Sequence, residues 1–323
     1  MFATTGLFVR FHSAPAPLPA ARDPIASPSL NGLSILLAAW FPRWRLTPTE
    51  EGPNRRRRIY SLSVTFWTFL WQVLNPGQPC RQAVRKVIAW FELLGGPAVS
   101  KDDSPYCQAR QRWPRQTLER ILPASAQAAE PRARQPWRFH GREVKVGDGT
   151  TLLMPDTLPN QNAYPQSARQ APGCGFPWLK MVALFLRDIK TTLQMERLSC
   201  QSPAMVDKEL LRHLIAYNLI RGVMVEAAGI YEVNMEELSF KGALDTVREF
   251  CPTILQAKKG AQRTGLINAL LSVLAHDRLP DRPHRVEPRV QKRRRKAYPF
   301  LCRPRQELKA RLLQPKNRKK HEP

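Results

Sequence analysis

Asp148 is the first side chain in this sequence with a setting that suits metal chemistry. It ends a segment with an apolar start at Val144, and Gly147 and Gly149 flank it. Glycines on both sides let a backbone and a phosphate group approach closely, and carboxylate oxygens are the ligands that Mg²⁺ and Mn²⁺ prefer. Asp-Gly is also among the commonest dipeptides of tight β turns. The residues alone leave a metal ligand and a turn residue as alternatives.

Other side chains that could take part in catalysis are better explained by structural roles. The carboxylates that follow Asp148 are expected to be solvated charges on helices or turns. His213 and Tyr217 lie on one face of a long helical segment, beside Leu210 and Leu214, and are expected to pack rather than to form a site. The sequence has no hydrolase nucleophile motif and no glycine-rich phosphate loop. The carboxylates considered are Asp156, Asp188, Glu196, Asp207 and Glu209.

Cysteine spacing and apolar run length exclude two further classes of protein. The 6 cysteines are scattered without a CxxC pair, so neither a zinc ribbon nor a redox dithiol is indicated. We expect reduced thiols, the default in a cytosol. The longest apolar stretch near the N-terminus, Leu33 to Phe41, is far shorter than the ~20 residues of a membrane helix. The sequence therefore predicts no membrane partner.

The charge is strongly positive and unevenly distributed. The formal net charge is +25, which places a positive potential over the surface and favours polyanions. DNA is the expected partner, with a solvated basic surface as the alternative. From residue 282 onward there are 16 Lys+Arg against 3 Asp+Glu, a surplus of 13. Such runs repel themselves and are expected to be disordered until they bind phosphates; the densest run includes Arg293, Arg294 and Arg295.

The N-terminal part of the chain is predicted to combine a loose extension with a helical domain. Residues 1–54 are rich in Pro, Ala and Ser without a sustained period, so we expect a disordered extension. Over residues 55–125 apolar residues recur at helical spacing between Pro and Gly stop signals. The expected helices run from Ile59 to Asn75, from Ala83 to Gly95, from Pro105 to Arg112 and from Arg115 to Leu122.

The rest of the sequence predicts a short β segment followed by helices. Val144 to Met154 has the pattern of two β segments separated by glycines, and Met181 to Leu186 is another apolar run. Ser202 is a suitable N-cap and Pro203 a suitable first-turn residue for a long helix that ends near Ala228. The expected order is a β-containing segment over 140–190, helices over 191–276 and a basic disordered tail over 277–323.

Several short motifs occur in an order that is similar to one known family. Together with the strand at Asp148 and the segment from Leu186 to Leu193, they resemble DDE transposases of the insertion sequence 4 family. The resemblance runs from about Tyr60 to Leu312. The motifs are Phe66 to Leu74, Tyr106 to Arg110, Leu153 to Thr157, Pro172 to Pro177, Lys208 to Leu210, Ala216 to Arg221, Ser239 to Leu244, Asp281 to Pro283 and Arg285 to Arg289.

The resemblance implies a transposase whose RNase H-like domain cuts and joins DNA with two divalent ions held by three carboxylates. It makes Asp148 the first catalytic and metal-binding carboxylate, with Mg²⁺ or Mn²⁺ as cofactor. It also implies binding to transposon ends and non-specific duplex, allows a dimer on DNA, and places the protein at the nucleoid of a bacterial cytoplasm. The DNA contacts that it implies are Arg110, Arg112, Arg115, Arg187 and Lys190. For the first three, solvated arginines of a plain helical bundle are the alternative.

The sequence departs from the family where the catalytic helix should lie. The family signature there is Tyr, two residues, Arg, three residues, Glu, six residues, Lys. With Lys190 as the Lys, the Glu falls at Ala183, the Arg at Leu179 and the Tyr at Phe176, and none of the three matches. The second Asp also has no counterpart. One carboxylate is too few to hold two ions.

An internal in-frame deletion, with its junction close to Phe185-Leu186, is the simplest explanation. Val144 to Lys190 is too short to close an RNase H-like sheet of about five strands, so the retained strands should leave exposed edges. The expected fold is mainly α with a truncated RNase H-like α/β segment. Two functions remain open: a transposase that the deletion has inactivated, or a non-enzymatic DNA-binding remnant that competes with intact transposase for transposon ends.

Overall fold

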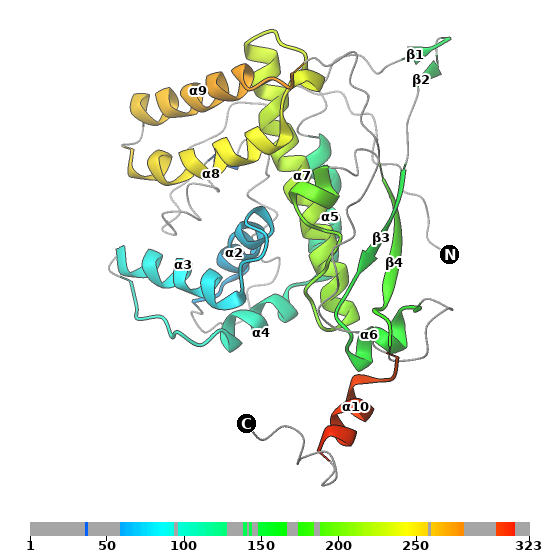
Figure 1. The fold of residues 1–323 in the computed structure, drawn as a ribbon. Coiled ribbons are helices and arrows are strands. Elements are labelled where there is room, and N and C mark those ends of the chain that lie inside the picture. The colour runs from blue at the N-terminus through cyan, green and yellow to red at the C-terminus, as the bar shows by residue number, and fades with distance from the viewer. Residues whose placement is uncertain are drawn as a thin grey trace, which may run out of the picture.

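Helices make up most of the part of the chain that the structure describes, as the sequence predicts (Figure 1). The computed structural model describes residues 36–37, 59–93, 96–127, 138–140, 142–143, 148–166, 174–183, 188–257, 260–280 and 302–313. The helices are α2 (Leu62–Leu74), α3 (Cys80–Leu93), α4 (Ser104–Arg112), α5 (Arg115–Gln127), α6 (Leu158–Ala163), α7 (Pro203–Ile230), α8 (Phe240–Gln256), α9 (Ala261–His276) and α10 (Arg305–Leu312). Short turns of other helix types cover Asp188–Thr192 (η4) and Met235–Glu237 (η5).

Local sequence sets both ends of α2. The Oγ of Ser61 accepts a hydrogen bond from the backbone N–H of Val64 at 3.3 Å, which satisfies one of the free donors of the first turn. Pro76 cannot continue the helix. Gly77 follows with φ of 81°, in the left-handed region that glycine adopts without steric cost. The predicted stop signal at Asn75 is confirmed, because α2 ends at Leu74.

The long helix α7 is the centre of the molecule. It packs against α2, α5, α8 and α9, and Ile215, Leu219 and Val223 are completely buried. Its predicted start is confirmed, with Ser202 as N-cap and Pro203 in the first turn, although the Ser202 side chain makes no capping hydrogen bond. One hydrophobic core includes residues of the N-terminal helices and of α7, α8 and α9. The two helical regions that the sequence suggests therefore pack as one body.

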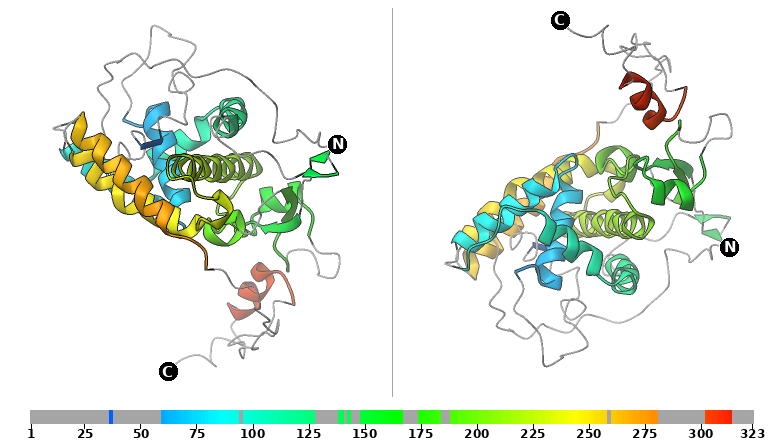
Figure 2. Two further views of the ribbon diagram at one scale, coloured as in Figure 1. Left: turned by 90° about the horizontal axis from the view of Figure 1, so that it is seen from above. Right: turned by 90° about the horizontal axis from the view of Figure 1, so that it is seen from below.

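Helices α8 and α9 lie side by side beyond the C-terminal half of α7 (Figures 1 and 2). The Oγ of Ser239 accepts from the N–H of Gly242 at 3.0 Å and caps α8. The end of α9 closes on this cap, since Ser239 donates its N–H to the Asp277 carbonyl at 3.2 Å. A Cβ at Gly242 would lie 1.5 Å from the Asp277 carboxylate, so this approach requires glycine.

A two-stranded antiparallel sheet lies beside the helical body (Figure 1). Strand β3 (Asp148–Leu153) pairs with β4 (Trp178–Ala183) from Asp148 opposite Ala183 to Leu153 opposite Trp178. These strands, β3 and β4, are called the hairpin below, although α6 lies between them in the chain. A second small pair joins β1 (Arg138–Phe139) to β2 (Arg142–Glu143). Within the described residues each of these sheets has two strands.

The strand positions correct two expectations. Asp148 does not end its strand, because the strand continues to Leu153. Gly149 lies opposite Val182, so Asp-Gly is not a turn here: both residues belong to the β3–β4 ladder. The apolar run predicted from Met181 starts earlier, at Trp178. Residues 144–147 and 184–187, which include Arg187 and the proposed junction at Phe185-Leu186, lie outside the described residues.

Two short helical pieces lie in regions that the sequence predicts to be disordered. Leu36 and Leu37 are helical and buried, because their side chains join the hydrophobic core; the rest of the 1–54 extension lies outside the described residues. In the tail, α10 forms from RQELKARL, whose straight-chain residues have high helix propensity. Arg293, Arg294 and Arg295 lie outside the described residues.

Candidate nucleic-acid interface

The position of Asp148 in the hairpin bears directly on metal binding. Asp148 lies opposite Ala183 in the strand pair, the position at which the family signature requires glutamate. Leu179 and Ala183, the positions of the signature Arg and Glu, both lie on strand β4. Four residues span about 13 Å along a strand but about 6 Å along a helix. These positions therefore do not form the single helical face that the signature describes.

Most other carboxylates near the hairpin have structural partners. Glu209 is buried, and its carboxylate accepts hydrogen bonds from Ser199 N at 3.0 Å, Ser199 Oγ at 2.6 Å and Cys200 N at 2.9 Å. The expectation of a solvated helix charge is wrong for Glu209, because the carboxylate closes the loop before α7. Asp156 accepts from the Gln161 amide. Among the described residues, no group of three His, Cys, Asp or Glu side chains is placed to hold a metal ion; the residues present do not fit two ions held by three carboxylates.

Arg110 lies in the core rather than on the surface. It is 7% exposed, and its guanidinium lies over the Phe69 ring, 3.9 Å from Cζ to the ring centroid. Its terminal nitrogens donate to the Sγ atoms of Cys80 and Cys200 at 3.2 and 3.1 Å. The implied role as a surface DNA contact therefore does not fit Arg110, since the apolar half of α4 turns it inward. Arg112, two residues later, is exposed.

Arg115 is exposed and belongs to an ion-pair network. Its Nε lies 2.9 Å from Glu119 Oε1, and its Nη1 lies 2.8 Å from Asp207 Oδ2. Tyr164 also donates its hydroxyl to Asp207 at 3.4 Å. The network joins α5 to the first turns of α7, so a phosphate at Arg115 would compete with two carboxylates.

His213 and Tyr217 pack as predicted. The Tyr217 ring stacks on Phe240, with centroids 5.3 Å apart. His213 is buried, and its Nδ1–H donates to the Glu209 carbonyl at 2.9 Å. Burial lowers the pKa of His213 because the charged imidazolium loses its hydration.

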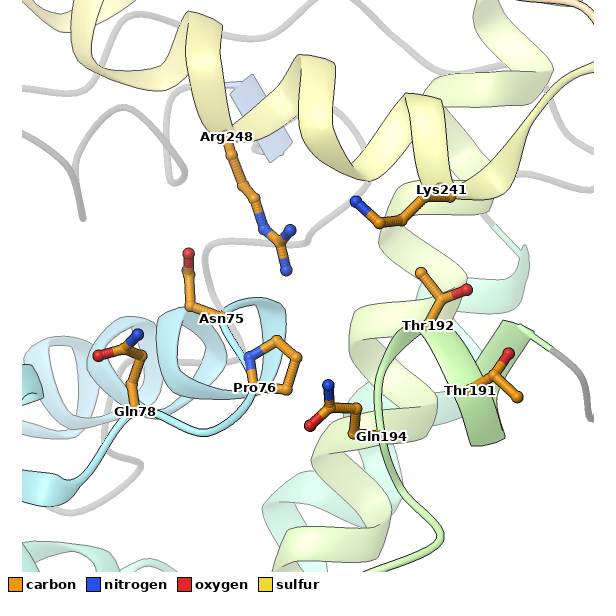
Figure 3. Close-up of a pocket in the computed structure, with 8 residues that line it drawn as sticks. All are labelled: Asn75, Pro76, Gln78, Thr191, Thr192, Gln194, Lys241 and Arg248. Carbon is orange, nitrogen blue, oxygen red and sulfur yellow. The ribbon is translucent and has the colours of Figure 1, made fainter. Parts of the chain in front are cut away.

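A polar cavity of about 430 Å³ lies where the end of α2 meets η4 and the first turns of α8 (Figure 3). In Figure 3 the Arg248 side chain extends from α8 toward Pro76 in the loop after α2, and the Lys241 side chain extends toward Arg248. Lys190, the signature lysine, lies on η4 directly before the lining residues Thr191 and Thr192 and is half-buried. The lining residues are Asn75, Pro76, Gln78, Thr191, Thr192, Gln194, Lys241 and Arg248.

The charges of this cavity favour an anion. Arg248 Nε donates to the Leu74 carbonyl at 2.7 Å, and Arg248 Nη1 lies 2.8 Å from Asp245 Oδ1. Lys241 pairs with the same carboxylate. Two cations thus share Asp245, which leaves a net positive charge beside hydroxyl and amide groups. Guanidinium, ammonium, hydroxyl and amide donors are the groups that contact DNA phosphates.

The chain is similar to a curated transposase. It is 35% identical over 124 residues to the transposase InsG for insertion sequence element IS4 from Escherichia coli (strain K12). This similarity supports a relationship to insertion-sequence transposases. The match covers 36% of this chain and 27% of that transposase. No family model matches the chain, and no solved structure matches it.

This transposase is of the same type as the family that the sequence motifs suggest. The aligned stretch of 124 residues is shorter than the predicted range from Tyr60 to Leu312. In addition, none of the described helices is long and apolar enough to cross a membrane.

Sequence reasoning missed the cavity on α8. Its lining residues come from three segments far apart in the chain, so no local sequence motif indicates the cavity. The available signal is the spacing of Lys241, Asp245 and Arg248 on one helix, which places three charges on one face. That pattern is also typical of an exposed surface, and only the fold brings it to Asn75 and Thr192.

Proposed function

We propose that this protein is a DNA-binding relative of insertion-sequence transposases that does not cleave DNA. The 35% identity to an IS4 transposase carries the proposal. A net charge of +25 supports it, because Lys and Arg bind the phosphate backbone with release of counterions.

The cavity on α8 is the proposed contact for a DNA phosphate within the described residues. Lys241 and Arg248 would approach the phosphate from α8, and Thr192 would donate a hydroxyl from η4. Arg248 is held in place by the Leu74 carbonyl, so its position is fixed before DNA binds. Such contacts orient a protein on the duplex without reading its sequence.

The hairpin supports the proposed loss of cleavage. Two-metal strand transfer requires carboxylates gathered around both ions. In this chain Ala183 stands opposite Asp148, and Glu209 and Asp207 are engaged with loop amides and Arg115. An in-frame deletion between β4 and η4 would account for the missing ligands, because it would remove the strands and the helix that bear them.

Binding is tested by fluorescence anisotropy of labelled duplexes against the full chain at several salt concentrations. We expect log K to fall linearly with log salt, and Lys241→Gln to reduce the slope by about 0.9, the value for one phosphate contact. Lys101→Gln is the matched control: it removes the same charge from an exposed position outside the cavity lining. Salt-independent binding would refute DNA binding, whereas equal effects of both variants would refute only the cavity.

Cleavage is tested with transposon-end duplexes in Mg²⁺ and in Mn²⁺. We expect no nicking and no strand joining, for the protein and for Asp148→Ala alike. Metal-dependent nicking that Asp148→Ala abolishes would show that another carboxylate completes the site. Stronger binding to transposon ends than to scrambled duplex would support the competitor role, and equal binding would favour a non-specific remnant.

A further inference from the structure

Two of the six cysteines contact one buried guanidinium, and a third lies beside one of these two thiols. Arg110 Nη1 donates to Cys80 Sγ at 3.2 Å, and Arg110 Nη2 donates to Cys200 Sγ at 3.1 Å. Cys107 lies close enough to Cys80 for each thiol to shift the pKa of the other. Cys80 is the first residue of α3, Cys107 lies on α4 and Cys200 precedes α7, so three segments of the chain bring the thiols together.

The surroundings of Cys80 select it as the anionic sulfur. Gln72 Nε2 lies 3.9 Å from Cys80 Sγ, and the Tyr106 hydroxyl donates to Gln72 Oε1 at 2.6 Å, which orients the amide N–H₂ away from Tyr106. Cys80 therefore has three donor groups around it: a thiol, a guanidinium and an amide. A buried cation such as Arg110 requires an anionic partner, and within the described residues no carboxylate lies in ion-pair distance of Arg110.

The acidities of the three thiols diverge accordingly. The Cys107 hydrogen bond, with help from Arg110, lowers the pKa of Cys80 to about 6 against the opposing effect of burial. The pKa of Cys107 is raised by its hydrogen bond to Cys80 and by burial, with a smaller contribution from Asp103. Burial, together with Glu209, raises the pKa of Cys200. One thiolate beside two neutral thiols is the expected state at neutral pH.

We propose that Cys80 is a redox-reactive thiolate and that Cys107 is its resolving partner, with hydrogen peroxide as the oxidant class. Both residues are partly accessible, whereas Cys200 is buried. The inference rests on the thiol cluster alone and does not depend on the proposed DNA binding.

The chemistry balances in two steps. The Cys80 thiolate attacks one peroxide oxygen, the O–O bond breaks, and a sulfenic acid forms as hydroxide leaves and takes up a proton. The Cys107 sulfur then attacks the Cys80 sulfur: the S–S bond forms, the S–O bond breaks, and the Cys107 proton leaves with the hydroxyl as water. Two thiols lose two electrons in total, and one peroxide becomes two waters.

Oxidation would change the packing of the N-terminal helices. A Cys80–Cys107 disulfide removes the negative charge that faces Arg110, and a buried cation without an anionic partner is strongly destabilising. Arg110 lies against Phe69 of α2. The disulfide is therefore expected to loosen the contact of α4 with α2 while it links α4 to α3.

The first experiment measures alkylation of the full chain by iodoacetamide between pH 5 and pH 9, with site-resolved mass spectrometry. Cys80 should be half-maximally reactive near pH 6. At pH 6 we expect it to react about tenfold faster than exposed Cys302, because a greater thiolate fraction outweighs its lower intrinsic nucleophilicity. Cys302 is the internal control. Equal pH profiles for the two thiols would overturn the proposal.

The second experiment treats the full chain with equimolar peroxide and digests it with trypsin without reduction. Peptides 59–81 and 102–110 carry Cys80 and Cys107, and they should appear as one cross-linked species. In Cys107→Ser, Cys80 should instead remain as a sulfenic acid that dimedone traps, while Cys302→Ser should retain the cross-link. Absence of the cross-link in a folded chain, or its persistence in Cys80→Ser through another cysteine, would refute the assignment.

Discussion

The helical body and the β3–β4 hairpin bury their apolar residues to very different extents. In α7, side chains such as Leu219 are completely buried between helices from both halves of the chain. In the hairpin, Leu152 faces the core and is buried, but Val182 is 76% exposed and Phe176, just before β4, is 58% exposed. The centre of the body is therefore covered by its own helices, whereas the hairpin buries one face and exposes the other.

The hairpin depends on the body for its stability. A hairpin of two strands is marginally stable in water unless it packs on other elements. Here β3 is held to the body through one segment: Leu153 N donates to the Glu196 carbonyl at 2.9 Å, and Leu198 N donates to the Leu153 carbonyl at 2.8 Å.

Truncation of buried and exposed apolar residues should give the largest contrast. Leu219→Ala leaves a cavity in the body and should lower the free energy of unfolding by about 2–5 kcal/mol. Val182→Ala removes an exposed side chain and should cost less than about 1 kcal/mol. Urea denaturation measures both. A cost for Val182→Ala that matches Leu219→Ala would mean that the outer face of the hairpin is covered in solution.

The link between body and hairpin should be the next most sensitive point. Glu209→Ala leaves the buried N–H of Cys200 and the donors of Ser199 without their acceptor and should cost about 2–3 kcal/mol. Hydrogen exchange should then accelerate in β3 while the middle of α7 keeps its protection.

Glu209→Gln is the matched control for this link. It keeps one acceptor oxygen and should lose less stability than Glu209→Ala. Uniform acceleration of exchange in α7 and β3 would show that the two regions open together, contrary to the comparison.

The helices were predictable from sequence and the hairpin register was not. Ser61, Asn75-Pro76-Gly77 and Pro203 act within a few residues of where they lie in the chain, so their signals are local and helix ends follow from them. The register that places Asp148 opposite Ala183 depends on strand pairing, which no local pattern states. Glycines near Asp148 suggested a turn because Gly149 is locally compatible with both states.

The interior polar groups were also beyond prediction. Arg110 and Glu209 are charged residues that sequence reasoning assigns to the surface. Both are buried, one among cysteine sulfurs and one among loop amides. Their partners, Cys200 and Ser199, lie in a segment without regular structure, so the pairs become visible only in three dimensions.

A pH-dependent loss of stability should originate in the body at His213. Burial lowers the pKa of this imidazole in the folded protein, so the unfolded chain binds a proton more readily as the pH falls below the ordinary value of about 6.5. Stability from this group is therefore complete above about pH 6.5 and decreases toward acid, by at most about 1.4 kcal/mol per pH unit. Urea midpoints from pH 7.5 to pH 5 measure this.

His213→Gln stays neutral throughout this range and is the matched control. Its urea midpoints should fall less steeply toward acid than those of the unmodified protein. Identical slopes for the two proteins would place the acid sensitivity at other groups.

The smallest expected effect distinguishes a surface contact of the body from a DNA contact. Arg115 pairs with Asp207 across α5 and α7, and the Arg115 side chain is 55% exposed. A double-mutant cycle with Arg115→Gln and Asp207→Asn should yield about 0.2–1 kcal/mol of coupling, the range for exposed pairs.

Because Asp207 and Glu119 already neutralise Arg115, Arg115→Gln should weaken DNA binding less than Arg112→Gln does. The reverse order, with the larger loss at Arg115, would mean that a phosphate displaces Asp207 on binding. In that case Asp207→Asn should by itself strengthen DNA binding, and the junction of α5 and α7 would belong to the DNA interface.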